Sequence, residues 1–361
     1  MNKLVNCGLE NRFGTNCLKW DGLKSRFGNE NLIAMWVADM DFKAPQPVID
    51  ALKERVNHGI FGYNIIPDSY YEAFINWEKE KHGYNVKKEW IRFSPGVVPA
   101  LFWFINILTN PGDSCIVMEP VYYPFHDAIK ENERKLIFNN LKNDNGIYTI
   151  DFEKFEEDII ENQVKLFILS SPHNPIGRVW TKEELKRVLD ICKANDVFVL
   201  ADEIHQDIII GDKKQIPAAT IGNYDDILVT LTAATKTFNL ASCQNSFVVI
   251  PNDEIREKFD KYYNSIGGDN GNVFGYIAVE AAYRYGEEWL KEILDKIRGN
   301  YEYTKSILSK HLPHVVISPL EGTYLAWYDF SYYIEEKDIK NFFQEKCNLA
   351  VDYGIWFGET G

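Results

Sequence analysis

Short apolar runs alternate with amphipathic stretches through the middle of this chain. Most of these runs have no polar position on either face, which is typical of strands buried on both sides of a parallel sheet. The predicted strands are residues 91–93, 115–118, 166–170, 197–201, 227–231 and 247–250. Helices are predicted between them, for example at residues 97–109 and 181–195. The pattern therefore predicts an α/β fold with a large domain in which helices sandwich a mostly parallel sheet.

The C-terminal part of the chain has a different pattern. A long helix is predicted at residues 287–310, and strand-like segments follow at residues 315–317 and 324–329. This order is typical of a smaller α+β domain. The irregular stretch before Pro45 has no place in the sheet and is the expected partner of this part. We predict a large domain over residues 46–285 and a small domain formed by residues 1–45 and 286–361.

Composition and charge limit the possible partners. The chain has 361 residues, 45% of them hydrophobic, which suits two domains with buried cores. Its 53 acidic residues outnumber its 39 basic residues and give a formal net charge of −14. Binding to nucleic acid or to an anionic membrane requires a basic surface, so neither partner is expected. A small anionic ligand needs only a local positive site and stays compatible with this charge.

The six cysteines and the start of the chain bear on location. No cysteine forms a CxxC pair or lies at metal-ligand spacing from a histidine, so we expect free thiols, no metal and a reducing compartment. The first eight residues lack the apolar core of a signal peptide, and no run reaches membrane-spanning length. The expected location is the cytoplasm.

Lys236 is the residue with the clearest chemical meaning. It lies in residues 231–240, a window whose other residues are all small, apolar or uncharged. A partly desolvated lysine loses proton affinity and becomes an amine nucleophile that can form a Schiff base. A lysine at a strand end can also extend its amine to solvent, and this segment alone fits both interpretations.

Two polar residues follow predicted strands directly. In open α/β sheets, ligands bind beyond the carboxyl ends of the strands. Asp202 directly follows the strand at residues 197–201, where it could cap a helix or hold a proton on a ring nitrogen. Asn174 precedes Pro175 in a sharp turn after the strand at residues 166–170, where it could serve the turn alone or contact a ligand.

Two further features lie at strand ends. Gly96 stands between a strand and an apolar helix, so it marks either a plain turn or a helix start whose free N–H groups bind an anion. Tyr122 follows the strand at residues 115–118, where it could pack or stack on a flat ligand. An amine, an acid, an amide, a phosphate cradle and an aromatic ring together fit one cofactor, pyridoxal phosphate.

The chain resembles pyridoxal-phosphate-dependent enzymes of the aminotransferase class I and II fold, also called fold type I. Within them it looks like the cystathionine β-lyase, or cysteine-S-conjugate β-lyase, branch. The resemblance spans nearly the whole chain and rests on six stretches: MWVADMDF at 35–42, FGY at 61–63, SPHNPIGRVW at 171–180, DEIH at 202–205, TKTFNLA at 235–241 and EGTYLAW at 321–327. The first stretch and His205 favour the lyase branch, because ordinary aminotransferases usually carry tyrosine at the His205 position.

The resemblance implies roles around the cofactor ring. Lys236 would form the Schiff base with the cofactor and later move the Cα proton of the substrate. Asp202 would pair with the pyridine nitrogen, Asn174 would bond the ring hydroxyl oxygen, and Tyr122 would stack on the ring. His205 would make a structural hydrogen bond or take part in catalysis, and both readings stay open.

The resemblance also implies a phosphate site and a homodimer. The backbone amides of Gly96, Val97 and Val98 would hold the phosphate together with the hydroxyls of Thr235 and Thr232. Tyr63 would extend into the site of the neighbouring subunit, so two copies of the chain would share each active site.

Two departures from the family pattern concern arginines. Aminotransferases often place a phosphate-binding arginine shortly after the lysine, and residues 240–246 contain none. The family also has an arginine near its C-terminus that binds the substrate carboxylate, and this sequence ends at Gly361 before any such position. We expect either an incomplete C-terminus or altered substrate binding, and the carboxylate anchor is unassigned.

The resemblance implies β-elimination on a sulfur amino acid, which yields a thiol, pyruvate and ammonia. An aminotransferase shares the first steps and is the main alternative. A cofactor-binding regulatory protein is a second one, disfavoured because the stretch before Pro45 is short, poorly helical and lacks a DNA-binding module. An α/β protein without chemistry is disfavoured because so many polar groups coincide at strand ends.

Overall fold

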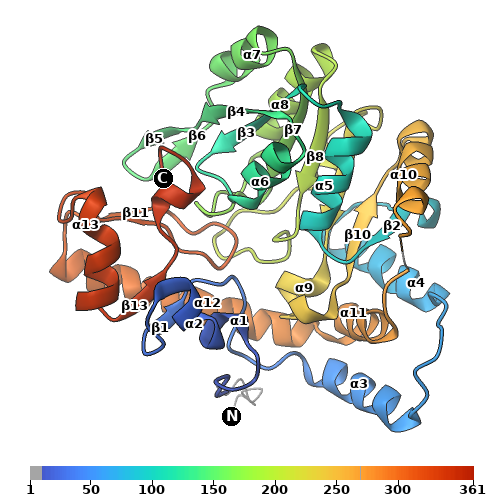
Figure 1. Ribbon diagram of the computed structural model, residues 1–361, viewed down its shortest axis with the longest axis horizontal. Helices are drawn as coiled ribbons and strands as arrows, with labels where there is room; N and C mark the ends of the chain where they lie inside the picture. Colours follow the sequence, from blue (N-terminus) through green and yellow to red (C-terminus); the bar gives the residue numbers. More distant parts are fainter. Residues whose placement is uncertain (1–9, 269) are drawn as a thin grey trace.

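The computed structural model of the chain describes residues 10–268 and 270–361. Cys7 and the start of the predicted small domain lie outside the described residues. The centre of the molecule is a seven-stranded sheet in the order β2-β10-β9-β8-β7-β3-β4 (Figure 1). Its strands are β2 (Ile91–Ser94), β3 (Ser114–Glu119), β4 (Lys135–Asn140), β7 (Val164–Ser170), β8 (Phe198–Asp202), β9 (Leu228–Thr232) and β10 (Ser246–Val249).

Strand directions confirm the predicted mostly parallel sheet. Only β10 runs antiparallel, to both β9 and β2, and every other neighbouring pair is parallel. All six predicted strands are present. The seventh, β4, was not predicted, because it is an edge strand with polar residues at Lys135, Asn139 and Asn140 instead of a continuous apolar run.

Helices cover both faces of the sheet. Neighbouring residues of one strand pack into different cores, as Val199 and Leu200 of β8 do. One face is covered by α5 (Val97–Leu108), α6 (Pro124–Glu131) and α10 (Asp253–Ser265). The other is covered by α7 (Phe152–Glu161) and α8 (Lys182–Ala194) at one end and by α4 (Asp68–Trp77) and α11 (Val273–Tyr285) at the other, with α3 (Gln46–His58) packed on α11. This burial on both faces explains why the strands lack alternation.

The N-terminal stretch joins the C-terminal tail, away from the large sheet. It forms α1 (Leu18–Asp21), α2 (Leu23–Phe27) and β1 (Ile33–Met35). Strand β1 pairs in parallel with β13 (Leu349–Val351), and both lie at the lower left of the molecule (Figure 1). Leu23, Leu32, Ala34 and Ala350 form a small core there. The N-terminal stretch and the C-terminal tail are thus paired through β1 and β13, while the small domain and its boundaries at residues 45 and 285 stay predictions.

The remaining C-terminal elements are α12 (Glu287–His311), β11 (Val316–Ile317), β12 (Tyr328–Asp329) and α13 (Glu336–Asn341). The predicted strand at residues 324–329 is wrong over residues 324–327. Thr323 has a left-handed φ of 66°, and its N–H donates to the Ile208 carbonyl, so the chain turns there before β12 begins. A small hairpin of β5 (Lys142–Asp144) and β6 (Ile147–Thr149) and the four-residue helix α9 (Ala234–Thr237) complete the elements that matter here.

Two findings concern membrane-spanning helices and the cysteines. In the part of the chain that the structure describes, no helix has both the length and the apolar character that crossing a bilayer requires. The five cysteines in this part, Cys17, Cys115, Cys192, Cys243 and Cys347, are all free thiols, as expected.

Candidate active site

The predicted polar groups meet at one edge of the sheet. Strands β3, β7, β8 and β9 are parallel, so their carboxyl ends lie together and the loops that follow them are neighbours. The N–H of Tyr122, after β3, donates to the Asn174 carbonyl, after β7, at 3.1 Å. The N–H of Ser171 donates to the Asp202 carbonyl at 2.9 Å. These bonds bring Tyr122, Asn174 and Asp202 into one group, and α9 with Lys236 follows the neighbouring strand β9.

Lys236 lies on α9, immediately after β9. Its Nζ donates a hydrogen bond of 2.7 Å to the carbonyl oxygen of Ala38. Burial lowers the pKa of Lys236, and the charges of Asp39 and Asp202 oppose that shift without cancelling it. The sequence window around Lys236 has no carboxylate, but the fold brings two close. The amine is therefore held in place and poorly solvated, as a nucleophile requires.

Asp202 lies at the end of β8 and is 6% exposed. One carboxylate oxygen accepts a hydrogen bond of 3.1 Å from the N–H of Ile204, which forms a turn in place of a helix cap. Burial raises its pKa to about 7, while the Ile204 bond and the Lys236 charge oppose the rise. A cation beside this carboxylate would restore its ordinary acidity, so the site favours a positively charged ring nitrogen there.

Asn174 and His205 carry free polar atoms inside the site. Both are buried, and neither the Asn174 side-chain oxygen nor His205 Nδ1 has a hydrogen-bond partner among residues 10–268 and 270–361. Burial and, to a smaller extent, the Lys236 charge together lower the pKa of His205 to about 3, so the ring is neutral. Buried polar atoms normally have partners, so these two suit a polar ligand at this place.

The start of α5 provides backbone N–H groups at the same edge of the sheet. Gly96 precedes the helix in an extended conformation, and no side chain caps the helix start. The amides of Val97 and Val98 belong to its first turn, whereas Pro99 has no N–H. A Cβ on residue 96 would lie 3.3 Å from the Pro99 ring, so glycine fits this tight entry best. The arrangement suits a bound phosphate.

The two threonines predicted near the phosphate differ in their surroundings. The buried Thr232 hydroxyl accepts from Gln206 Nε2 at 3.0 Å and faces the Glu203 carbonyl at 3.4 Å. It therefore belongs to a buried polar cluster with Gln206 and Glu203. Thr235 lies in the first turn of α9 and is only half-buried. Phosphate contacts by either residue stay predictions.

Tyr122 and Tyr63 have contrasting environments. Tyr122 is half-buried and packs edge-on against Phe125, with ring centroids 5.8 Å apart, so part of the ring serves packing. Burial, and then the charges of Tyr123 and Asp202, raise the pKa of its hydroxyl. Tyr63 is fully exposed in the single chain, with Phe61 and Ile65 exposed beside it. Its predicted role in a neighbouring subunit stays a prediction.

A backbone carbonyl and a tyrosine were missed by the sequence analysis. The Ala38 carbonyl that holds Lys236 also accepts the Tyr324 hydroxyl at 2.7 Å. The Tyr324 ring meets His205 edge-on at 5.7 Å. Both residues lie in quoted stretches, but a carbonyl group is present at every position and gives no signal in the sequence.

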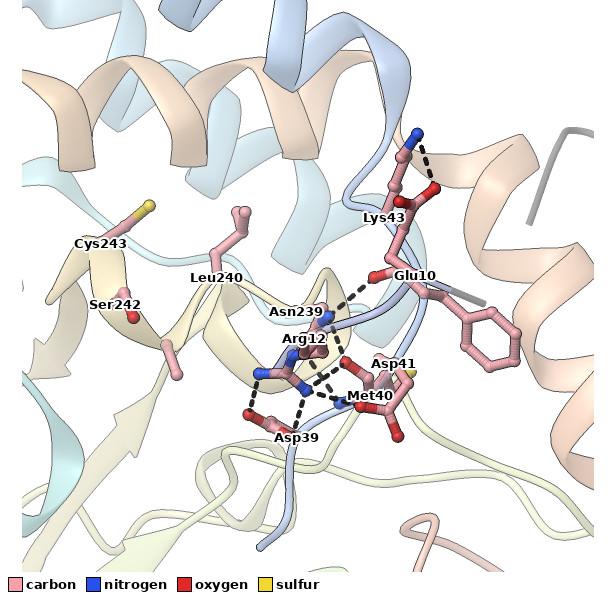
Figure 2. Close-up of a pocket in the computed structure, with 12 residues that line it drawn as sticks. Glu10, Arg12, Asp39, Met40, Asp41, Lys43, Asn239, Leu240, Ser242 and Cys243 are labelled. Carbon is pink, nitrogen blue, oxygen red and sulfur yellow. Dashed lines mark hydrogen bonds and ion pairs between the residues drawn. The ribbon is translucent and has the colours of Figure 1, made fainter. Parts of the chain in front are cut away.

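The segment around Ala38 is fixed by ion pairs and by Asn239 (Figure 2). Arg12 makes a two-pronged pair with Asp39 at 2.9 and 2.8 Å and a further bond to Asp41 at 2.8 Å. Asn239, three residues after Lys236, donates to the Met40 carbonyl at 2.8 Å and accepts from the Met40 N–H at 3.0 Å. The lysine segment and the N-terminal segment are thus tied directly to each other.

The fold and this site define a class of protein. The family model for aminotransferase class I and II matches residues 30–358, and the chain belongs to that family. Cystathionine beta-lyase PatB of Bacillus subtilis (strain 168) is 39% identical to it over 354 residues, which are 98% of this chain and 92% of PatB.

Two solved structures are also similar. Cystalysin from Treponema denticola, whose structure contains a pyridoxal 5'-phosphate cofactor, has a TM-score of 0.94 and 35% identity and is matched over 98% of this chain and 91% of its own. The pyridoxal-phosphate-bound C-S lyase from Staphylococcus hominis has a TM-score of 0.91 and 35% identity, over 97% and 89%.

Proposed function

We propose that this chain is a pyridoxal-5'-phosphate-dependent carbon–sulfur β-lyase. It would act on cystathionine or related cysteine conjugates and release a thiol, pyruvate and ammonia. The observation that carries the proposal is the pairing of a desolvated amine, Lys236, with a buried carboxylate, Asp202, close enough for their charges to shift each other's pKa. The similarity to cystathionine beta-lyase PatB and to the C-S lyase from Staphylococcus hominis supports the lyase reaction in particular.

The residues present fit pyridoxal phosphate. Asp202 would face the pyridine nitrogen, the unpartnered side-chain amide of Asn174 would face the ring hydroxyl oxygen, and Tyr122 would lie against the ring. The first-turn amides of α5 at Val97 and Val98, with Gly96 before them, would hold the phosphate. When bound, the cofactor supplies an aldehyde for amines and a ring that withdraws electrons from Cα of the substrate.

Lys236 would bond the cofactor and, once displaced by the substrate amine, move the Cα proton. Its lowered pKa increases the fraction of neutral amine at neutral pH, and only the neutral form accepts a proton. The Ala38 carbonyl would keep the free amine inside the site. Loss of the Cα proton allows the sulfur substituent on Cβ to leave as a thiolate with its bonding electron pair.

Asp202 would keep the proton on the ring nitrogen throughout the reaction. A buried carboxylate with a raised pKa gains much from a neighbouring positive charge, because that charge removes the cost of ionising it. His205 is neutral, and its ring meets the Tyr324 ring edge-on. These features favour a role in positioning the residues around the cofactor ring over a role in proton transfer.

An aminotransferase is the second candidate, because the family model that matches the chain carries that name. Both reactions begin with removal of the same proton by Lys236. They differ in whether a group leaves from Cβ or the amino group is passed to a keto acid.

We further propose a cytoplasmic homodimer in which Tyr63 enters the neighbouring site. The exposed aromatic and aliphatic side chains of Phe61, Tyr63 and Ile65, on one short loop, support a covered surface there. No residue is proposed as the carboxylate anchor.

Purified protein supplied with pyridoxal phosphate and cystathionine, with no keto acid added, tests the proposal. A lyase releases pyruvate continuously, and an aminotransferase does not turn over without an acceptor. Pyruvate in proportion to thiol supports the lyase; product formation that requires an added keto acid contradicts it. Cystine and cysteine assayed in parallel would rank the substrates.

A further inference from the structure

The carboxylate of Asp207 is hydrogen-bonded to α9, the helical turn that carries Lys236. Asp207 follows β8 by five residues, and its side chain is only 3% exposed. Its Oδ2 accepts a hydrogen bond of 2.8 Å from the hydroxyl of Thr237. Thr237 is fully buried, ends α9 and directly follows Lys236. One hydrogen bond therefore joins a buried carboxylate to the residue beside the amine.

The other oxygen of Asp207 is held from a different part of the fold. Oδ1 accepts from Trp77 Nε1 at 2.9 Å and lies 2.7 Å from His82 Nε2. Trp77 ends α4, and His82 ends the π-helical turn η1 (Glu78–His82) that continues it. The carboxylate cannot rotate without breaking bonds to two elements, so it is a fixed point for Thr237.

The charges of this cluster strengthen the hold. Burial alone would lower the pKa of His82, but the hydrogen bond and charge of Asp207 raise it to about 9. Burial alone would raise the pKa of Asp207, but its bonds to His82, Trp77 and Thr237 keep it below the usual range. The pair is therefore ionised at neutral pH, and a charged acceptor binds the Thr237 hydroxyl more strongly than a neutral one.

Helix α9 depends on such external contacts. It has four residues, and no side chain caps its start. A single helical turn has little stability of its own, because few hydrogen bonds repay the ordering of its backbone. The tip of Lys236 is held by the Ala38 carbonyl, and the next residue, Thr237, is held by Asp207.

We propose that Asp207 and Thr237 are positioning residues that fix the direction in which the Lys236 side chain leaves α9. The inference rests on the proposed function, since it takes Lys236 as the amine that bonds pyridoxal phosphate. The side chains of both residues bond to each other, and that of Asp207 also to Trp77 and His82, whereas no hydrogen bond among the described residues joins either side chain to a predicted ring or phosphate contact. Their loss should therefore slow covalent capture of the cofactor and turnover more than it weakens binding.

Thr237→Val tests this directly, because valine keeps the shape and removes the donor, while Thr237→Ser keeps the donor. Cofactor-free protein is mixed with pyridoxal phosphate and quenched with borohydride at intervals, and modified Lys236 peptide is measured by mass spectrometry. A misplacement of about 1 Å can cost on the order of 100-fold in rate, so we expect capture to slow at least about tenfold in Thr237→Val. In Thr237→Ser the rate of cofactor capture should stay within about twofold of that of the natural protein. In Thr237→Val, kcat should fall along with the capture rate while KM stays nearly constant.

A matched control is Thr109→Val. Thr109 is also buried and lies at the C-terminal end of α5, opposite the predicted phosphate contacts at its start. Its hydroxyl donates to the Ile105 carbonyl and accepts from Arg134. This variant should capture the cofactor at the natural rate. A coupling test compares Asp207→Asn, Thr237→Val and the double variant. Because the two residues act through one hydrogen bond, their effects on the rate of cofactor capture should not be additive. The Thr237 pair decides the question even if Asp207→Asn fails to fold.

The outcomes separate the two claims. If Lys236 of the natural protein is never modified, the proposed function fails. If Lys236 is modified and Thr237→Val captures the cofactor at the natural rate, the positioning role is overturned and the function stands. Equal slowing in Thr237→Val and Thr109→Val, or additive effects of Asp207→Asn and Thr237→Val, would also overturn it.

Discussion

The ε-amine of Lys236 lies 2.7 Å from the carbonyl oxygen of Ala38, a residue 198 positions earlier in the chain. The Tyr324 hydroxyl donates to the same oxygen at 2.7 Å. Two donors from distant segments thus meet on one backbone acceptor. This arrangement gives the amine a fixed resting place, and no residue of the described part of the chain forms a direct ion pair with it, so burial can still lower its pKa.

Removing the second donor should change the basicity of the amine. In Tyr324→Phe the Ala38 carbonyl serves only Lys236, so the bond to the protonated amine strengthens and its pKa rises. The acidic limb of the pH profile of kcat should therefore move to higher pH, by less than about one unit. Tyr328→Phe, which removes a hydroxyl on β12, is the control and should leave the limb unchanged. A shift to lower pH would contradict this account of the shared carbonyl.

Asp202→Asn should separate cofactor attachment from catalysis. The amide cannot hold a proton on the ring nitrogen by charge, so electron withdrawal weakens and kcat should fall at least about 100-fold. Lys236 should still capture the cofactor, which borohydride trapping would show. Asp190→Asn, at a carboxylate on α8 that bonds Tyr224, should retain activity. Near-natural turnover by Asp202→Asn would rule out the proposed role.

Glu321 connects the C-terminal part to the large sheet. Its Oε2 accepts from Arg178 at 3.0 Å and from the Val179 N–H at 2.9 Å, and both side chains of the ion pair are mostly buried. Glu321→Ala leaves the Val179 N–H without its partner, while Arg178 keeps its ion pair with Glu184 at 2.6 Å, so the free energy of unfolding should fall by about 1–2 kcal/mol.

Urea unfolding would measure the effect of Glu321→Ala. The control is Glu335→Ala, because the Glu335 side chain is 73% exposed and its ion-pair partner, Lys337, is equally exposed. That change should stay within about 0.5 kcal/mol. Equal effects of the two substitutions would show that Glu321 is not a structural link.

The His82–Asp207 pair predicts how stability depends on pH. The pKa of His82 in the folded chain, about 9, lies above its ordinary value of 6.5. The stability that the pair adds is therefore complete below about pH 6.5 and is lost as pH rises through 9. The difference in unfolding free energy between the natural chain and His82→Gln should shrink by at least about 1 kcal/mol from pH 6 to pH 9.5. A difference that stays constant or grows with pH would contradict the ion pair.

Much of the fold was predictable because its signal is local. The runs at residues 166–170 and 197–201 are apolar at nearly every position, which only strands buried on both faces require. The edge strand β4 was missed because one side of it faces polar surroundings. The false strand at residues 324–327 was predicted from side chains, whereas the left-handed backbone at Thr323 decides the path there.

The site was predictable where chemistry depends on side chains at strand ends. Lys236, Asp202 and Asn174 could be found from their places after apolar runs. Ala38 could not be found, because its contribution is a carbonyl oxygen that every residue has. Asp207 and Thr237 gave a weaker signal, a carboxylate and a hydroxyl inside otherwise buried stretches, and only the fold shows that they meet.

The most direct test is borohydride reduction of the purified protein after incubation with pyridoxal phosphate, followed by peptide mass mapping. The account predicts a single modified lysine, Lys236, in the natural protein and no modified lysine in Lys236→Ala. Modification of a different lysine, or none at all, would contradict the central claim that this amine and Asp202 form one cofactor site.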